Sequence, residues 1–152
     1  MSVDKRGDIL ARVKAIYATV PGIAQVYSNR GDVDQMNLPA LVLLDGNEIR
    51  RTAVGPRNFM SMQVMVLQPQ TFLVLKPKTR VADQELLTAE MSDWRTKILG
   101  KLATDRLLPG LLGDDGFIEY LGYTTDLQTG SEMKGSMQFT IHFGYLFDPA
   151  DL

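Results

Sequence analysis

The amino-acid sequence predicts an α+β domain, with a mainly antiparallel mixed sheet of about four to five strands and two main helices packed on it. Residues 136–147 alternate apolar and polar side chains, as a half-buried strand does. Residues 4–19 and 82–105 carry apolar side chains at helical spacing, and short apolar runs lie between them. A chain of 152 residues can close its own hydrophobic core, so we expect residues 1–152 to form a single domain.

Composition excludes several classes of protein. The chain contains no cysteine, which rules out a disulfide scaffold, a thiolate zinc site and a thiol nucleophile. Its net charge of −2 argues against a protein that grips nucleic acid through the phosphates. The longest apolar run, residues 40–44, is far shorter than the ~20 residues that cross a bilayer. The first ten residues lack the apolar core of a signal peptide, so we expect synthesis in the cytosol.

The first half of the chain begins with a predicted helix at residues 4–19. Ile9, Val13, Ile16 and Val20 form its apolar stripe, Asp4 or Asp8 caps it, and residues 21–22 (Pro-Gly) end it. A strand at 23–28 and a polar loop at 29–38 follow. Residues 40–45 are continuously apolar up to a final Asp, which predicts a strand covered on both faces, and the Asp-Gly pair at 45–46 is a turn signal.

Residues 48–58 lack a hydrophobic period and are predicted to form a loop that carries Arg50, Arg51 and Arg57. Two interpretations stay open: a solvated surface loop, or a basic finger that touches a partner or a phosphate. Residues 59–67 and 71–76 are then predicted to form strand. Because Pro69 cannot donate a ladder hydrogen bond, this region is either a hairpin with residues 68–70 at its tip or one long bent strand.

Residues 82–105 are predicted to form the second, longer helix. Its apolar positions, Leu87, Met91, Trp94, Ile98 and Leu102, recur at spacings of three and four, and Asp83 is the expected cap. Residues 107–116 form a turn-rich passage, residues 117–124 a strand, and residues 125–135 an exposed loop.

The final strand, residues 136–147, returns antiparallel beside residues 117–124. We expect one face of it to be buried and the other to be wet, because its side chains alternate in character. The buried face comprises Met137, Phe139, Ile141, Phe143, Tyr145 and Phe147.

Residues that carry chemistry do not form a recognisable set. His142 is the single histidine and lies on the polar side of the final strand, and no nucleophile elbow accompanies it. The acidic residues are scattered, and Asp114-Asp115 is the only adjacent pair. The sequence therefore predicts no catalytic residues, no cofactor and no metal site, and a protein that is not an enzyme.

Several local features occur in a characteristic order. An amphipathic helix ends before Pro-Gly-Ile-Ala-Gln-Val at 21–26, and Leu-Pro-Ala-Leu-Val at 38–42 runs into Asp-Gly. A Met-rich strand at 60–66 precedes the helix that ends near Leu102, and the chain closes with Gly-Ser-Met-Gln-Phe-Thr-Ile-His-Phe-Gly-Tyr at 135–145. In order, length and spacing, nearly the whole chain resembles the tail-terminator or tail-completion proteins of tailed bacteriophages.

The resemblance implies a virion structural protein, made in the cytoplasm of the host bacterium and located in the tail or neck. Such subunits form a ring, usually a hexamer, that caps the last ring of the tail tube and stops tube polymerisation. The implied partners are further copies of the chain, the tail-tube protein, a connector protein on the head side and, in contractile tails, the sheath. Genomic DNA passes through such a ring without specific binding, and no membrane is involved.

The two polar loops are the predicted contact regions. The candidate interface residues are Arg50, Arg51 and Arg57 in the first loop, and Gln128, Glu132, Met133 and Lys134 in the second. Two alternatives remain: another head–tail connector protein of the neck, or a small intracellular ligand-binding or enzymatic α+β domain. Assembly state distinguishes them, because a ring is essential only to a tail or neck protein.

Overall fold

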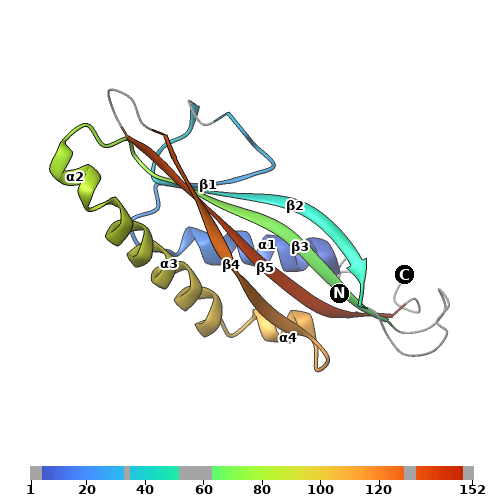
Figure 1. Ribbon diagram of the computed structural model, residues 1–152. Helices are drawn as coiled ribbons and strands as arrows, with labels where there is room; N and C mark the ends of the chain where they lie inside the picture. Colours follow the sequence, from blue (N-terminus) through green and yellow to red (C-terminus); the bar gives the residue numbers. More distant parts are fainter. Residues whose placement is uncertain (1–4, 33–34, 52–62, 129–132, 149–152) are drawn as a thin grey trace.

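The computed structural model describes residues 5–32, 35–51, 63–128 and 133–148. The helices are α1 (Lys5–Ala18), α2 (Val81–Glu85), α3 (Leu87–Thr104) and α4 (Leu108–Leu112); the strands are β1 (Gln25–Ser28), β2 (Ala40–Arg50), β3 (Gln63–Val74), β4 (Phe117–Gln128) and β5 (Lys134–Phe147). The strands form one sheet in the order β1-β2-β3-β5-β4 (Figure 1). Only the β1–β2 pair is parallel, so the predicted α+β fold with a mainly antiparallel mixed sheet is confirmed.

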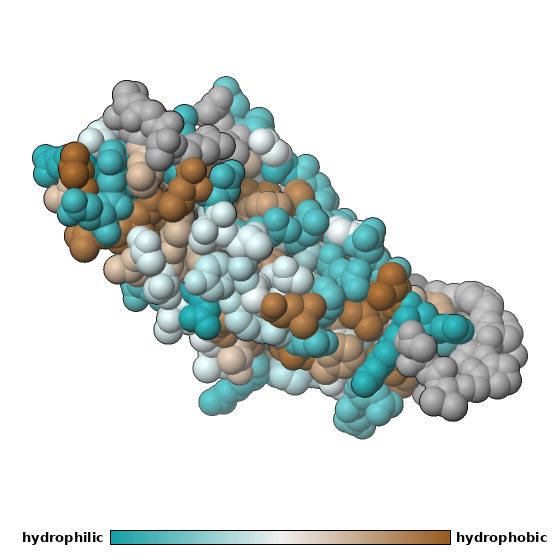
Figure 2. Space-filling model, in the orientation of Figure 1, coloured by the Kyte–Doolittle hydropathy of each residue, from teal (hydrophilic) through white to brown (hydrophobic). Residues whose placement is uncertain are grey.

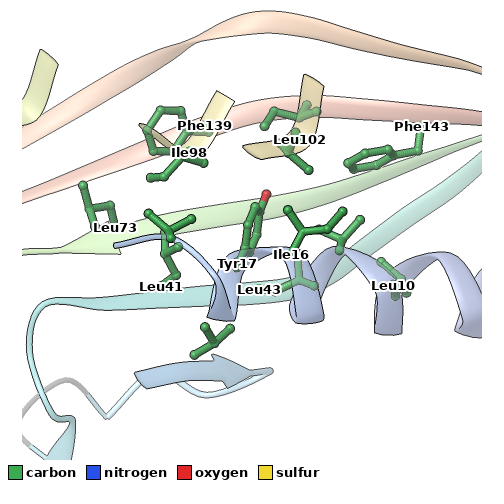
Figure 3. Close-up of a cluster of buried hydrophobic side chains, with 14 of the residues drawn as sticks. Leu10, Ile16, Tyr17, Leu41, Leu43, Leu73, Ile98, Leu102, Phe139 and Phe143 are labelled. Atoms are coloured by element: carbon green, nitrogen blue, oxygen red, sulfur yellow. The ribbon is translucent and has the colours of Figure 1, made fainter. Parts of the chain in front are cut away.

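The main core lies between one face of the sheet and the helices α1, α3 and α4. Apolar side chains of all three helices pack against those of β2, β3 and β5 in one cluster. Figure 3 shows Ile16 and Tyr17 of α1 beside Leu43 and Leu73 of the sheet, with Ile98 and Leu102 of α3 close by. The predicted apolar stripes of the two main helices are confirmed, because every residue named for them is buried.

The predicted alternation of β5 is also confirmed. Phe139 and Phe143 are 0% exposed, whereas Thr140 between them is exposed on the opposite face. Beneath this layer the hydroxyl groups of Tyr17 and Thr71 lie 2.8 Å apart and share a hydrogen bond. Burial raises the pKa of Tyr17 to about 12, so the phenol stays protonated and the bond persists at physiological pH.

The opposite face of the sheet carries a smaller apolar cluster. Ala40 and Val42 of β2 lie in it with Met36, and Tyr27 and Phe72 pack against them. Their neighbours Leu41 and Leu43 point into the main core. This strand segment is therefore covered on both faces, as its continuous apolar run predicts.

Pro69 lies inside one long strand, and of the two open interpretations the long bent strand is confirmed. β3 runs unbroken from Gln63 to Val74. Across from Pro69, the register of β2 shifts between Leu44 and Asn47, which is a β-bulge. Gly46 in the bulge has φ +66°, and a Cβ there would come within 2.1 Å of the Gln68 carbonyl oxygen. The Asp45-Gly46 pair is thus a bulge within β2, and the turn predicted there is wrong.

Three predictions about the helical half are wrong in detail. The single helix predicted for 82–105 is two helices, interrupted at Leu86. α2 buries none of its residues and so lacks packing that would hold it in line with α3. Asp83 lies in the first turn and does not cap, since the N-cap position is Arg80. The passage predicted as turns at 107–116 contains the short helix α4, which forms because Leu108 and Leu112 bury against the core.

Both predicted loops are partly strand. Glu48 to Arg50 continue β2, because they pair with β3 up to Arg50 opposite Met65. Thr125 to Gln128 continue β4 and pair with Lys134 to Met137 of β5. Strand pairing supplies backbone partners for these polar residues, which their composition alone does not reveal. Residues 52–62 and 129–132 lie outside the described part of the chain.

An ion pair joins α1 to the start of α4. The Arg12 guanidinium donates to both carboxylate oxygens of Asp105, with Nε 3.1 Å from Oδ2. The same carboxylate accepts the backbone N–H of Leu108 at 2.8 Å. The hydrogen bond from Arg12 holds the pKa of Asp105 below its ordinary 3.8, although partial desolvation opposes this shift. The contact fixes where the chain turns from α3 into α4.

We predict that Phe139→Asp prevents folding, because it places a carboxylate in a fully apolar layer. The matched control is Thr140→Asp on the exposed face of the same strand, which is expected to fold with a melting temperature close to that of the wild type. Circular dichroism melts measure both variants. A Phe139→Asp protein that melts like the wild type would show that the assignment of faces is wrong.

Asp105→Asn is predicted to lower stability at neutral pH and to have little effect in acid. A carboxylate whose folded pKa is depressed stabilises the fold above its unfolded pKa and loses that contribution as pH falls through the folded value. The difference in unfolding free energy from the wild type is therefore expected to be constant above about pH 5 and to shrink below 3.8. Urea titrations from pH 7 to pH 3 measure it, with Asp93→Asn in the exposed pair with Lys97 as control. A difference independent of pH would contradict the ionic role of Asp105.

Candidate partner interface

The most prominent surface feature is the outer edge of β4. This strand closes one side of the sheet, and no described strand lies beyond it. Four large apolar side chains on β4 are exposed, and we call them the β4 ridge: Ile118 (39%), Leu121 (52%), Tyr123 (46%) and Leu127 (47%). Natural proteins usually protect long edge strands with charges, bulges or covering elements, because unpaired backbone groups invite another strand. A long apolar edge is therefore a candidate surface for contact with a partner.

The local sequence explains the conformation of β4 at the ridge. The register with β5 shifts between Tyr120 and Gly122, which makes Leu121 the extra residue of a bulge. Gly122 takes φ +119°, a conformation that glycine adopts readily. Arg95 of α3 braces the strand from the helix side: its Nε donates to the Tyr120 hydroxyl at 3.2 Å and its guanidinium lies 5.7 Å from the Tyr123 ring.

Arg50 is the last residue of β2 and Arg51 follows it. The C-terminal end of β2 is at the right of Figure 1. The Arg51 N–H donates to the Val64 carbonyl at 2.8 Å, and its guanidinium lies 5.3 Å from the ring of Phe117. The ring of Phe117 packs against the backbone of Gly144, and a Cβ atom built on Gly144 would lie 2.1 Å from the ring. Strand pairing thus holds the backbone of Arg51 while a cation–π contact orients its side chain.

A hollow of about 640 Å³ adjoins these residues on the sheet face away from the helices. Both arginines line it together with the carboxylates of Asp114, Asp115 and Glu119, and with His142. The hollow is therefore bordered by charges of both signs, which suits salt-bridge contacts with a protein surface better than capture of an anion.

His142 lies directly across from Glu119 in the β4–β5 register. Among the residues that the structure describes, no group of three or more His, Asp or Glu side chains is placed to hold a metal ion. Within the same residues no helix is long and apolar enough to cross a membrane. A carboxylate beside an imidazole can orient it for proton transfer, but the arrangement here includes no hydroxyl nucleophile in the hollow.

The second set of predicted interface residues lies at the other end of the sheet. Gln128 is the last residue of β4 and stands opposite Lys134, the exposed first residue of β5. Met133 is half-buried, packs against the main core and exchanges two backbone hydrogen bonds of 2.8 Å with Lys78. Arg57 and Glu132 lie outside the described residues.

The structure therefore separates the two predicted contact regions. Arg50 pairs with Met65 at one end of β3, whereas Ser136, two residues after Lys134, pairs with Val74 at the other end. The described residues of the two regions therefore lie at opposite ends of the sheet.

A second hollow, of about 650 Å³, lies beside the smaller apolar cluster. Met36, Leu38, Phe72 and Val74 form its apolar wall, and Arg30 and Lys134 stand among its polar lining. Arg30 is occupied by an ion pair with Asp32, with Nε 2.5 Å from Oδ1. This hollow has the apolar lining of a small-ligand pocket, although its location on an open sheet face leaves it accessible.

The sequence did not reveal the β4 ridge as an interface. Ile118, Tyr120, Leu121 and Tyr123 form an apolar stretch that looks like an ordinary buried strand. Only the sheet order shows that this strand is at the edge, and Figure 2 shows apolar patches exposed between hydrophilic surface. The departure from strict alternation at Leu121-Gly122 is the one signal that indicated a bulged edge.

Comparisons with known proteins add no assignment. No model of a protein family matches the chain, and no curated protein matches it.

His142→Ala is predicted to leave stability and assembly unchanged. The imidazole is only half-buried on the sheet face away from the core, so the unfolding free energy should change by no more than about 0.5 kcal/mol. Chemical denaturation and native mass measure the two properties. Gly144→Ala serves as positive control, because its methyl group would displace the ring of Phe117, which lines the same hollow. Loss of assembly by His142→Ala with the fold intact would indicate a functional site at this histidine.

Proposed function

We propose that this protein is a ring-forming structural subunit of a tailed-phage virion, the tail terminator. In this role a ring of subunits, most simply a hexamer, caps the last ring of the tail tube, stops tube polymerisation and offers a joining surface to the head. The resemblance of nearly the whole chain to that family supports the identity of the assembly. The observation that carries the structural part is the apolar edge of β4, beyond which no described strand lies.

The edge supports self-assembly for a physical reason. β4 is 12 residues long, so its outer side offers a row of backbone donors and acceptors together with the β4 ridge. Pairing with another strand satisfies those groups and removes the ridge from water in a single contact. Apolar area removed from water contributes roughly 25 cal/mol per Å², which favours such a contact further.

The placement of the charged regions supports a joining role. Arg50 and Arg51 lie at one end of the sheet and Lys134 at the other, while the β4 ridge runs between these ends. A subunit that uses its edge for ring closure keeps both ends available for other proteins. A terminator needs this arrangement, because one face of its ring meets the tube and the other meets the head.

A second candidate function rests on the hollow beside Met36 and Phe72. Its volume of about 650 Å³ and its apolar wall would suit a small apolar ligand in a monomeric binding domain. The two functions differ in assembly state, since a ring is required only by the first. They also differ in the residues on which they depend, because the hollow and the β4 ridge share none.

The proposed function predicts a discrete ring that one charge on β4 disrupts. Native mass spectrometry and light scattering over a concentration series are expected to show one closed oligomer for the wild type. Leu121→Lys places a charge at the edge and is expected to weaken assembly at least tenfold, about 1.4 kcal/mol, with an unchanged melting temperature. Leu107→Lys is the matched control, because Leu107 is 62% exposed but lies outside β4.

A second measurement tests the partner. Adding the protein to polymerising tail-tube protein is expected to stop tube growth, and the Leu121→Lys protein is expected to stop it less efficiently. A wild-type protein that stays monomeric at every concentration and leaves tube growth unchanged would contradict the proposed function.

A further inference from the structure

We infer that neighbouring copies join head to tail, with the β4 edge of one copy pairing antiparallel to the β1 edge of the next. In this contact Tyr123 and Leu127 of the β4 ridge lie beside a hollow between α1 and β1 of the neighbour. The inference rests on the proposed ring and specifies the surfaces that close it. Four features of the described residues support it: two free edges, the strand directions, the alignment across the sheet, and the match between ridge and hollow.

The sheet has two different edges. β4 closes one side and β1 the other, and β1 has β2 as its only described strand neighbour. β1 is four residues long and parallel to β2, so it covers β2 only from Ala40 to Leu43. A contact between two different edges is heterologous, and heterologous contacts generate rings when the rotation between copies closes.

Strand directions make the pairing antiparallel. β1 runs parallel to β2; β3 runs opposite to β2, β5 opposite to β3, and β4 opposite to β5. β4 therefore runs opposite to β1. When a second copy is placed beside β4 in the same orientation, its β1 meets β4 as an antiparallel neighbour, and the sheet continues across the contact with its regular hydrogen-bond pattern.

The two edges also lie at the same level of the sheet. One row of aligned residues crosses all five strands: Gln25, Ala40, Val74, Ser136 and Asp126. The next level joins Val26 through Leu41, Leu73 and Met137 to Thr125 in the same way. A copy added without displacement along the strands therefore brings its β1 beside the second half of β4.

The hollow at the β1 edge has a mostly apolar lining and lies on the helix side. It measures about 390 Å³. Its lining comprises Ala15, Ala18, Ile23, Ala24 and Val26, together with Lys14 of α1 and Gln25 of β1. Two alanines in α1 leave room where larger side chains would fill the space. Val26 belongs to the main core, so the hollow opens on the same side of the sheet as the helices.

Tyr123 and Leu127 of the β4 ridge project on that same side. The Tyr123 ring lies 6.4 Å from the ring of Phe139, a core residue. Leu127 lies opposite Gly135 in the register with β5. A Cβ atom built on Gly135 would lie 3.5 Å from Cδ2 of Leu127 and 3.3 Å from Cδ2 of Leu87 in α3, so Leu127 is on the helix side of the sheet. Both ridge residues flank the level at which a neighbouring β1 would lie. In the β4–β1 contact, projecting apolar side chains thus meet an apolar hollow. A β4–β4 contact would instead bring two projecting ridges together, without a hollow to receive them.

Cysteine pairs test the contact, because the natural chain contains no cysteine. Gln25→Cys is combined in turn with Thr124→Cys, Thr125→Cys and Asp126→Cys, and each protein is oxidised with copper phenanthroline at the concentration at which the wild type forms its ring. Directly opposed Cβ atoms in adjacent antiparallel strands lie about 4.5–5.5 Å apart, close enough for a disulfide. At least one double variant is expected to give a ladder of covalent multimers up to the full ring on a non-reducing gel.

Single variants and one displaced pair serve as controls. Gln25→Cys with Val81→Cys, an exposed position in α2, is expected to give no ladder. A ring of wild-type mass without a ladder from any β4 pair would overturn the inference and leave the proposed function standing. Dimers from a β4 cysteine alone would overturn it in favour of a two-fold β4–β4 contact. A strictly monomeric wild type would overturn the inference together with the ring.

Discussion

Burial of one face of β5 is the constraint on which the rest of the structure depends. Phe139 and Phe143 are fully buried, and they occupy the layer that α1, α3 and α4 cover. Burying a side chain of this size contributes roughly 1.5–3 kcal/mol, so the helices are held to this face. These three helices lie on one side of the sheet. On the other face, among the described residues, Met36 and Leu38 pack against Ala40 and Val42 of β2. β1 and β4 form the two edges of the sheet.

The two edges are protected to different degrees. β1 has four residues, and short edge strands offer few backbone groups to a stray partner. β4 has 12 residues and a single bulge at Leu121, and Arg95 holds its tyrosines in place on the helix side. A strand that is both long and braced is organised for a specific contact. The bulge adds to this, since it limits the registers in which another strand can pair along β4.

The parts of the fold that the sequence predicted are those set by local periodicity. The stripes of α1 and α3 and the alternation of β5 depend on side chains three, four or two positions apart. Sheet order depends on pairing between distant segments, so neither the edge position of β4 nor the extension of β2 to Arg50 could be read locally. Pro69 shows this limit of local prediction. The residues around it were compatible with a hairpin or with one long bent strand, and the bulge at Gly46 on the neighbouring strand β2 decides between them. For the candidate site, the sequence identified Arg50 and Arg51, but the contact of Arg51 with Phe117 depends on Gly144 in a third strand.

In the proposed ring, the sheet surfaces that would pair neighbouring copies differ from those that would join the ring to other proteins. Edge pairing uses backbone groups along the sides of the sheet, whereas the hollow beside Arg51 and the region around Lys134 lie at its two ends. The ends also differ chemically: one brings arginines together with Asp114 and Glu119, and the other adjoins the apolar hollow beside Phe72. Because opposite ends carry different chemistry, the proposed ring, in which all copies pair edge to edge in one orientation, would have two unlike faces. A ring with unlike faces can stack on a tube end through one face and refuse a further tube subunit at the other, which is the property that termination requires.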